Sequence, residues 1–286
     1  MAGTSAAGWR WDPSLYEGSA AYYTRGRVPY PPKLIALIID ELDLDGHGRL
    51  LDVGCGPGSL TVPLATHVEQ AVGVDPDEQM LVEASHQATA AGVTNIEWVH
   101  RRGEDLSLDL GRFQVVTMAQ SFRWMDRGQV AGLLHQLLTR DGAIVYVHAT
   151  THQGVDGTAR LPYPRPPREE IDALVATFLG QERRAGRGFR HLGPVTEDER
   201  SQIEAGLFTE AGFVGPVRRT VPGWLSTRVT DEVMASVFSL SYAAPHLFGD
   251  RRETFEQEVR GLLNHVSPTD LFSEQMREIA VEIWRA

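Results

Sequence analysis

The stretch Arg49–Gly58, RLLDVGCGPG, decides the fold of this 286-residue chain. Its first half is a short apolar run, which is typical of a strand buried on both faces of a parallel sheet. Its second half is a glycine-rich turn, where the absence of side chains lets a ligand approach the backbone closely. The stretch therefore predicts an open α/β sheet with a nucleotide-type turn after its first strand, although a tight turn without a ligand would also explain the glycines.

The sequence around this turn alternates short apolar strands with longer amphipathic helices, which predicts parallel βαβ units. The strands expected in this half are Arg49–Val53, Ala71–Val74, Ile96–Val99, Val115–Met118 and Ala143–Val147. The helices expected to cover them are Pro31–Leu42, Asp77–Ala91 and Arg127–Leu138.

The pattern loses its regularity after His148, where proline, glycine and arginine accumulate over 160–170 and 183–194. The helices expected beyond this point are Glu169–Leu179, Ile203–Ala211, Thr230–Leu240 and Arg251–Leu263. A strand is expected near Val217–Val221, and the alternation of Ile279, Val281 and Ile283 predicts a closing strand.

Composition and charge exclude several classes of protein. With 42% apolar residues the chain can bury a full core. Its 38 acidic and 27 basic side chains give a net charge of −11, which disfavours nucleic-acid and anionic membrane partners. Cys55 has no partner for an internal disulfide, and no run of about 18 apolar residues is present. We expect a cytoplasmic chain without a membrane span, and leave open whether it forms a homo-oligomer.

The spacing of the glycines separates two kinds of nucleotide site. A dinucleotide-dependent oxidoreductase has G-x-G-x-x-G, whereas Gly54, Gly56 and Gly58 form G-x-G-x-G, which places no pyrophosphate on the helix N-terminus. Asp75 ends the next expected strand about 20 residues later, where a carboxylate can accept both hydroxyls of a ribose. Asp77 is the better cap for the following helix, so we expect Asp75 to face a ligand.

The turn resembles that of the class I S-adenosylmethionine-dependent methyltransferases, with Asp52 at the acidic position. Two further stretches are similar to the branch of trans-aconitate methyltransferase-like, or type 11, proteins. They are AYYTRGRVPYPPKL at 21–34, which holds Tyr23, Arg27, Tyr30 and Pro31, and AQSFRW at 119–124. The resemblance implies a Rossmann-like α/β fold of the class I methyltransferases, with a seven-stranded sheet and a helical cap.

The pattern along the chain predicts how it is divided, and the resemblance adds the N-terminal lid. An N-terminal lid would occupy 1–30, and the cofactor-binding core would occupy 31–150. A cap insertion would follow over 151–200. The rest of the core would lie over 201–286, with a second cap insertion near 225–272.

S-adenosyl-L-methionine is the cofactor that the resemblance implies. The glycines of the turn would pack against the methionine moiety of the cofactor. Asp75 would hold the ribose, and Met80 would lie near the adenine. The adenine edge would be met by the GED segment 103–105, where the choice between Glu104 and Asp105 stays open. The full set of expected cofactor contacts is Tyr23, Arg27, Asp52, Gly54, Gly56, Gly58, Asp75, Met80, Gly103, Glu104, Asp105 and Gln120.

The acceptor side departs from the family at Arg123, where relatives commonly have histidine. A guanidinium stays protonated and cannot act as a base. Arg123 either holds an anionic substrate group or pairs with a surface carboxylate such as Asp126. The candidate catalytic residues are Tyr16, Tyr23, Phe122, Arg123 and His148, with Phe122 either a pocket wall or part of the core.

Two histidines, His148 and His152, follow the expected strand Ala143–Val147. His148 is a candidate base, because the carboxyl end of a central strand is where such sheets present groups to a ligand. His148 and His152 lie four residues apart, but this spacing joins metal ligands on a helix and not at a strand end, so we expect no metal site.

We predict methyl transfer to an oxygen or nitrogen of a small molecule, and the resemblance alone favours specialised metabolism such as antibiotic biosynthesis. Three alternatives stay open. They are C-methylation of a small molecule, a dinucleotide-dependent oxidoreductase and a non-catalytic cofactor-binding module.

Overall fold

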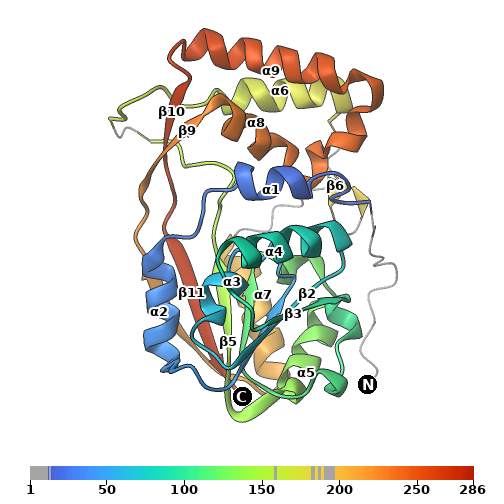
Figure 1. The fold of residues 1–286 in the computed structure, drawn as a ribbon, viewed down its shortest axis with the longest axis vertical. Helices are drawn as coiled ribbons and strands as arrows, with labels where there is room; N and C mark the ends of the chain where they lie inside the picture. The colour runs from blue at the N-terminus through green and yellow to red at the C-terminus, as the bar shows by residue number, and fades with distance from the viewer. Residues whose placement is uncertain (1–11, 13, 158–159, 182–183, 186–187, 190–196) are drawn as a thin grey trace.

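A computed structural model gives the structure of the chain in two parts, an α/β part and a helical part (Figure 1). It describes residues 12, 14–157, 160–181, 184–185, 188–189 and 197–286. Residues 1–11 and 13 of the expected lid, and several residues of 158–196 in the expected first cap insertion, lie outside the described residues. None of the helices in the described part is long and apolar enough to cross a membrane.

The α/β part is built on one seven-stranded sheet with the order β3-β2-β1-β4-β5-β11-β8. The first five of these strands run parallel, whereas β11 runs antiparallel to both of its neighbours. The seven strands predicted from the sequence are thus confirmed. They are β1 Arg49–Val53, β2 Gln70–Asp75, β3 Ile96–His100, β4 Phe113–Ala119, β5 Leu138–His148, β8 Val214–Val221 and β11 Ile279–Arg285.

Helices cover both faces of this sheet because successive strand residues point to opposite sides. Leu50 of β1 packs with α2 (Pro32–Leu42) and α3 (Thr61–Ala65), whereas Leu51 belongs to the core formed with α5 (Arg127–Leu137). The helix α7 (Glu197–Glu210) contributes Phe208 to the α5 side, and α4 (Glu78–Ala90) lies against β2 and β3. The expected helices of this half are all present.

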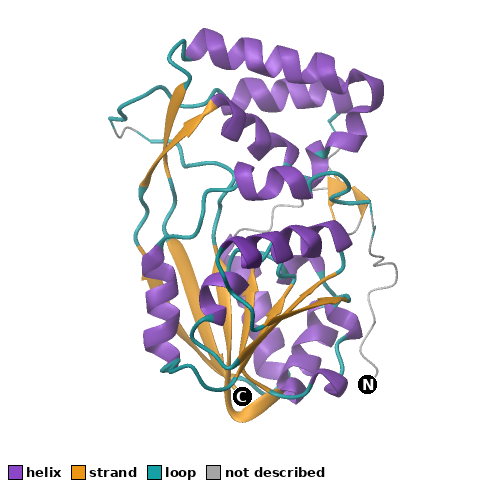
Figure 2. Ribbon diagram, viewed as in Figure 1, coloured by secondary structure: helices purple, strands orange, loops and turns teal. Residues whose placement is uncertain are grey.

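The cap is a separate layer of helices with its own apolar core (Figure 2). Its members are α1 Ala20–Gly26, α6 Arg168–Leu179, α8 Thr230–Phe238 and α9 Arg252–Val266. The helix α1 packs so closely on α8 that a Cβ added to Gly26 would lie 2.4 Å from the backbone of Ala235. The segment expected as a lid therefore includes a helix that is docked on the cap.

Two strands that the sequence did not predict join the cap to the sheet. The strands β9 (Leu225–Val229) and β10 (Leu271–Gln275) form an antiparallel ladder within the region expected to be a helical insertion. Each strand has mixed polarity, LSTRV and LFSEQ, and each finds its partner far along the chain, so neither carries a local signal. The cap is therefore helical with a β ladder at its base. Short elements complete the described fold, namely β6 Arg184–Ala185, β7 Gly188–Phe189, η1 Gly103–Asp105, η2 Leu108–Leu110, η3 Phe122–Trp124, η4 Ser241–Ala243 and η5 Pro245–Arg251.

Candidate active site

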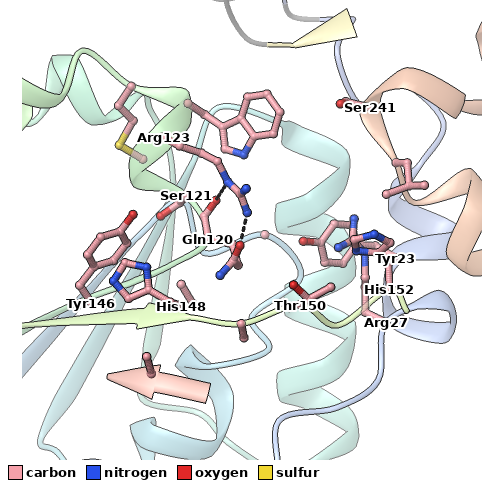
Figure 3. A pocket seen from close by; sticks show the side chains of 18 of the residues that line it. Tyr23, Arg27, Gln120, Ser121, Arg123, Tyr146, His148, Thr150, His152 and Ser241 are labelled. Carbon is pink, nitrogen blue, oxygen red and sulfur yellow. Dashed lines mark hydrogen bonds between the residues drawn. The ribbon is translucent and has the colours of Figure 1, made fainter. Parts of the chain in front are cut away.

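A cavity of about 1040 Å³ lies between the carboxyl ends of the parallel strands and the cap (Figure 3). Its walls come from the turns after β1, β2, β4 and β5, from the N-terminal segment and from the cap. Open α/β sheets bind ligands at this edge because every parallel strand delivers its following loop there.

The three glycines of the first turn have different surroundings. All three have positive φ, with values of 70° at Gly54, 53° at Gly56 and 77° at Gly58. A Cβ on Gly54 would lie 2.4 Å from the Cβ of Ser121, and one on Gly58 would lie 2.9 Å from the Trp98 ring. A Cβ on Gly56 would meet nothing within 4 Å, and Gly56 lines the cavity. Gly58 thus packs against the Trp98 ring and is absent from the cavity wall, and its cofactor contact stays a prediction.

Asp75 stands at the cavity end of β2 with two backbone partners. The amides of Gly56 and Asp77 each donate to one of its oxygens at 2.9 Å. Burial raises the pKa of this carboxyl to about 7. Asp77 caps α4 as predicted, accepting from the amides of Gln79 and Met80. Each Asp75 oxygen keeps a second lone pair that a ligand can use.

Asp52, expected as a cofactor residue, instead supports the turn from inside the core. It is 2% exposed, and the Thr61 hydroxyl donates to its Oδ2 at 2.5 Å. Burial raises the pKa of Asp52 to about 6. Asp52 is absent from the cavity wall, so its contribution to a ligand would pass through the backbone of the turn.

The structure separates the two acidic candidates near the expected adenine edge. Glu104 lines the cavity beside Met80 and Gly103, and its carboxylate accepts from the amide of Asp126 at 2.7 Å. Asp105 points outward, with its side chain 49% exposed and ion-paired with Arg102 at 2.6 Å. Of the two, the geometry favours Glu104 as the residue that can meet a ligand in the cavity.

Gln120 follows β4 with a backbone φ of 63°, in the left-handed region that a residue with a Cβ rarely adopts. Its side chain amide donates to the Val147 carbonyl at 3.4 Å, and its oxygen accepts from Arg123. Strained residues of this kind persist where the surroundings over-determine them, and they cluster at functional sites. Gln120 lines the cavity, as expected.

The N-terminal segment closes one side of the cavity with aromatic rings. The Tyr16 ring packs edge-on against Tyr23 and Trp124, with centroid distances of 6.5 and 6.1 Å. Arg27 lies 4.5 Å from the Tyr23 ring centre and donates from Nε to the Ser239 hydroxyl at 2.8 Å. Burial raises the pKa of Tyr16, so its hydroxyl stays protonated at neutral pH.

The structure decides between the two orientations of Arg123. Its guanidinium faces the cavity and donates to the backbone carbonyl and the side chain oxygen of Gln120. Asp126 instead caps α5 by accepting from the amide of Gln129. Phe122 is fully buried, stacked on Phe208 at 5.0 Å, so it belongs to the core and not to the cavity wall.

His148 lines the cavity next to a buried carboxylate that the sequence gave no reason to expect. Glu282 of β11 lies directly opposite Tyr146 in the sheet, and His148 is two residues beyond Tyr146 on the same face. The Nε2 of His148 is 4.0 Å from the Oε2 of Glu282, whose Oε1 accepts from Arg218 at 3.0 Å.

A second buried carboxylate, Glu204 of α7, accepts from the Tyr146 hydroxyl at 3.1 Å. Arg127 also donates to it at 3.1 Å. The sequence could have shown that Tyr146 lies on the same face of the sheet as His148, because the two are two residues apart on one strand. Glu204 and Glu282 could not be found in this way, because they reach the cavity only through the packing of distant elements.

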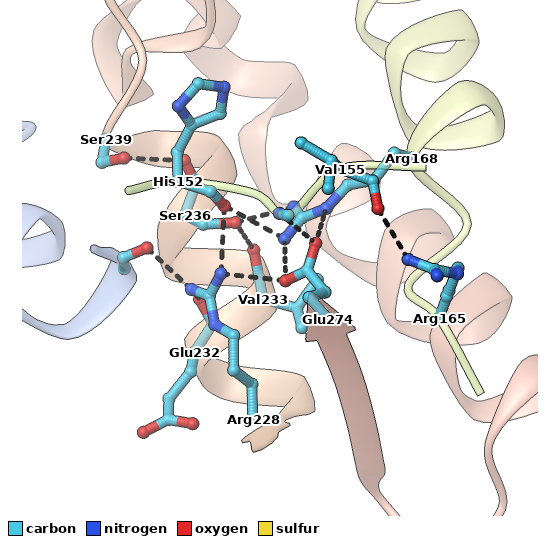
Figure 4. Close-up of polar contacts among 12 residues, drawn as sticks. His152, Val155, Arg165, Arg168, Arg228, Glu232, Val233, Ser236, Ser239 and Glu274 are labelled. Carbon is cyan, nitrogen blue, oxygen red and sulfur yellow. Dashed lines mark hydrogen bonds and ion pairs between the residues drawn. The ribbon is translucent and has the colours of Figure 1, made fainter. Parts of the chain in front are cut away.

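His152 also lines the cavity, beside Tyr23 and Arg27 (Figure 3). Burial and surrounding arginines lower the pKa of His152 well below its usual range. Its backbone carbonyl accepts from two cap arginines, Arg168 and Arg228, which both contact Glu274 (Figure 4).

Comparison with known proteins finds a methyltransferase match over part of the sheet, from β1 into β5. Residues 50–142 match a family model described as a methyltransferase domain. An uncharacterized methyltransferase from Mycobacterium tuberculosis H37Rv is 30% identical over 142 residues, which are 49% of this chain and 55% of the relative. An uncharacterized RNA methyltransferase from Nostoc is 32% identical over 115 residues, 40% of this chain and 24% of that protein. The chain thus matches a quarter to about half of the length of these relatives.

Solved structures resemble a larger part of the chain. A protein from Bacillus halodurans C-125, provisionally described as a methyltransferase, has a TM-score of 0.50 at 15% identity, covering 88% of this chain and 97% of its own. The [4+2]-cyclase SpnF has a TM-score of 0.50 at 16% identity, covering 91% of this chain and 83% of its own. The expected Rossmann-like α/β fold of the class I methyltransferases is confirmed. Residues 50–142 are similar to a methyltransferase domain. The narrower trans-aconitate-like branch stays a prediction.

Proposed function

We propose that this chain is an S-adenosylmethionine-dependent methyltransferase that methylates an oxygen or nitrogen atom of a small molecule. The observation that carries the proposal is that Gly56 and Asp75 line the same cavity as Arg123 and His148. A shared cavity lets a cofactor and an acceptor be held in line, which is the main requirement of a methyl transfer. The fold alone would not support this activity, because one protein of the same fold is named a [4+2]-cyclase.

The residues present fit the proposed cofactor. The turn is open at Gly56, where a side chain would enter the cavity, and Asp75 offers free lone pairs toward the same space. Asp75 would hold the ribose, Met80 and Glu104 would border the adenine, and Gln120 would face the methionine end. When bound, S-adenosylmethionine supplies a methyl group made reactive by its positively charged sulfur.

The chain's own groups would orient the acceptor, exclude water and accept a proton. The rings of Tyr16, Tyr23 and Trp124 form a wall that keeps water from the reacting atoms. Arg123 presents N–H donors to an anionic group of the acceptor, should it carry one. His148, next to the Glu282 carboxylate, is the group best placed to take a proton from a hydroxyl or ammonium acceptor.

Two observations support a small acceptor over RNA, although one relative is named an RNA methyltransferase. Cap residues Leu240, Ser241 and Tyr242 line the cavity opposite the sheet, and the net charge of −11 repels a phosphate backbone. A tailoring step in specialised metabolism fits a cavity of about 1040 Å³ with mixed polar and aromatic walls.

The test is methyl transfer from S-adenosylmethionine with a deuterated methyl group, followed by mass spectrometry. Catechol, tyramine and benzoate represent hydroxyl, amine and carboxylate acceptors, and total RNA is a further arm. Calorimetry with S-adenosylhomocysteine and with NAD measures the cofactor preference. We expect binding of S-adenosylhomocysteine only and transfer to at least one small acceptor. Binding of NAD alone, or transfer to RNA alone, would overturn the proposal.

A further inference from the structure

One buried arginine contacts two backbone segments that border the cavity (Figure 4). Arg228 of β9 is 3% exposed. It donates to the carbonyl of Gly26 at 2.7 Å and to that of His152 at 3.0 Å. Gly26 ends α1 and directly precedes Arg27, so both contacts fix backbone next to cavity-lining side chains.

Two further side chains complete this buried network. Glu274 of β10 accepts from Arg168 at 2.9 Å and from Arg228 at 3.4 Å, and it also accepts from the amide of Gly154 at 3.0 Å. Arg168 of α6 donates to the His152 carbonyl at 3.1 Å. The loop 152–154 is therefore fastened at both ends by side chains from three different elements. Because two arginines share one carboxylate, either can be removed while Glu274 keeps a cation.

The His152 ring occupies a different position from its backbone, since it faces the cavity beside Tyr23 and Arg27 (Figure 3). Burial is the largest cause of the lowered pKa of His152, followed by the charges of Arg27, Arg168, Arg123 and Arg228. Both arginines of the network engage the Glu274 carboxylate, and the pKa of His152 is lowered even so. The imidazole is therefore neutral at neutral pH.

A neutral imidazole has one nitrogen that donates a hydrogen bond and one that accepts. A hydroxyl group has the same dual capacity, whereas a carboxylate only accepts and an ammonium only donates. A hydroxyl group therefore finds a partner at either ring nitrogen, whereas a carboxylate can use only the N–H and an ammonium only the lone pair.

We propose that His152 contacts a hydroxyl group of the methyl acceptor, and that Arg228 is the positioning residue that holds His152 in the cavity. The inference rests on the proposed function, which supplies the acceptor. It adds the chemical class of the acceptor. It also assigns a role to the β9–β10 ladder, which brings Arg228 and Glu274 to the loop after β5.

The first experiment follows the His152 imidazole by NMR in the full-length chain labelled with ¹⁵N-histidine and saturated with S-adenosylhomocysteine. The variant His152→Gln identifies the signal. We expect the ring to stay neutral from about pH 8 to about pH 6. In Arg228→Met its pKa should rise toward about 6.5, the value of an unperturbed histidine, because a charge is lost and the ring gains water. Arg168→Met is the second variant in case the first fails to fold. An unchanged titration in the folded variants would overturn the positioning role.

The second experiment compares acceptors. His152→Gln should raise the KM of a hydroxyl acceptor such as catechol about tenfold, the loss of one good hydrogen bond, with the Kd of S-adenosylhomocysteine unchanged. Arg260→Met is the matched control, because Arg260 is a half-exposed cap arginine that pairs with Asp231 and Glu256. An unchanged KM in His152→Gln would overturn the contact. Failure of the wild-type chain to methylate any acceptor would overturn the proposed function instead. The NMR titration would still test the positioning role of Arg228.

Discussion

The two ends of the cavity are built in opposite ways. The proposed cofactor end comes from residues 54–120, in which consecutive βαβ units deliver their turns to one edge, and Asp75 is held by the amides of Gly56 and Asp77 close by. The proposed acceptor end comes from β5, α7, the cap and β11, and the N-terminal segment with Tyr23 and Arg27 lines the same cavity. Local backbone geometry fixes the first end, and long-range packing fixes the second. Substitutions at the two ends should therefore fail in different ways.

The largest expected effect is at the cofactor end, in Gly56→Val. The new side chain would fill cavity space, because nothing lies within 4 Å of the position of its Cβ. We expect the Kd of S-adenosylhomocysteine to rise more than about 100-fold, a loss of about 3 kcal/mol. Calorimetry measures the affinity.

Gly46→Val is the matched control for this substitution. Gly46 also has a positive φ, 92°, with nothing within 4 Å of a Cβ, but it is not part of the cavity wall. Both variants should lose about 1–2 kcal/mol of stability from left-handed backbone strain. If Gly46→Val weakened binding as much as Gly56→Val, strain and not occupied space would be the cause, and the open turn would lose its assigned role.

At the acceptor end, Arg123→Met should spare the cofactor. Its guanidinium faces the cavity, so an anionic acceptor such as benzoate should lose charge-assisted hydrogen bonds and show a KM about thirtyfold higher. The Kd of S-adenosylhomocysteine should not change. Arg25→Met removes a surface arginine paired with Asp231 and should be silent. An unchanged KM for benzoate in Arg123→Met would show that Arg123 does not bind the anionic group of the acceptor.

The cofactor end should also respond to pH through Asp75. Because burial raises its pKa to about 7, this carboxyl ionises only as the pH rises through that value. The ionised form accepts both ribose hydroxyls, so the affinity for adenosine should rise about tenfold between about pH 6 and about pH 8. Calorimetry at the two pH values measures this, and Asp75→Asn should bind weakly and without pH dependence. A flat profile in the wild-type chain would contradict the ribose assignment.

The smallest effect should separate two neighbouring carboxylates. Glu104→Gln should weaken S-adenosylhomocysteine binding about threefold, because Glu104 lines the cavity and also holds the amide of Asp126. Asp105→Asn should change binding by less than the error of the measurement, because Asp105 forms an exposed ion pair with Arg102. A larger loss of affinity in Asp105→Asn than in Glu104→Gln would show that the segment 103–105 changes conformation when the cofactor binds.

Much of the cofactor end could be predicted, because the determining signals are local. The strand, the glycine register and the cap at Asp77 are all read within a few residues. Even so, the sequence could not distinguish Gly56 from Gly58, since the difference lies in the Trp98 ring of β3, which is separated from β1 by β2 in the sheet. Phe122 was equally undecided, because Phe208, on which it stacks, comes from a helix much later in the chain.

The sequence by itself determined the order of strands and helices, the nucleotide-type turn and the acidic residue that follows it, because hydrophobic period and turn chemistry act over short distances. Only the tertiary structure decided which way Arg123 points, that Glu282 lies beside His148, and that Arg228 reaches the carbonyl of His152. These contacts join elements far apart in the chain. They exist only after the sheet and the cap have packed against each other, so no pattern along the chain encodes them.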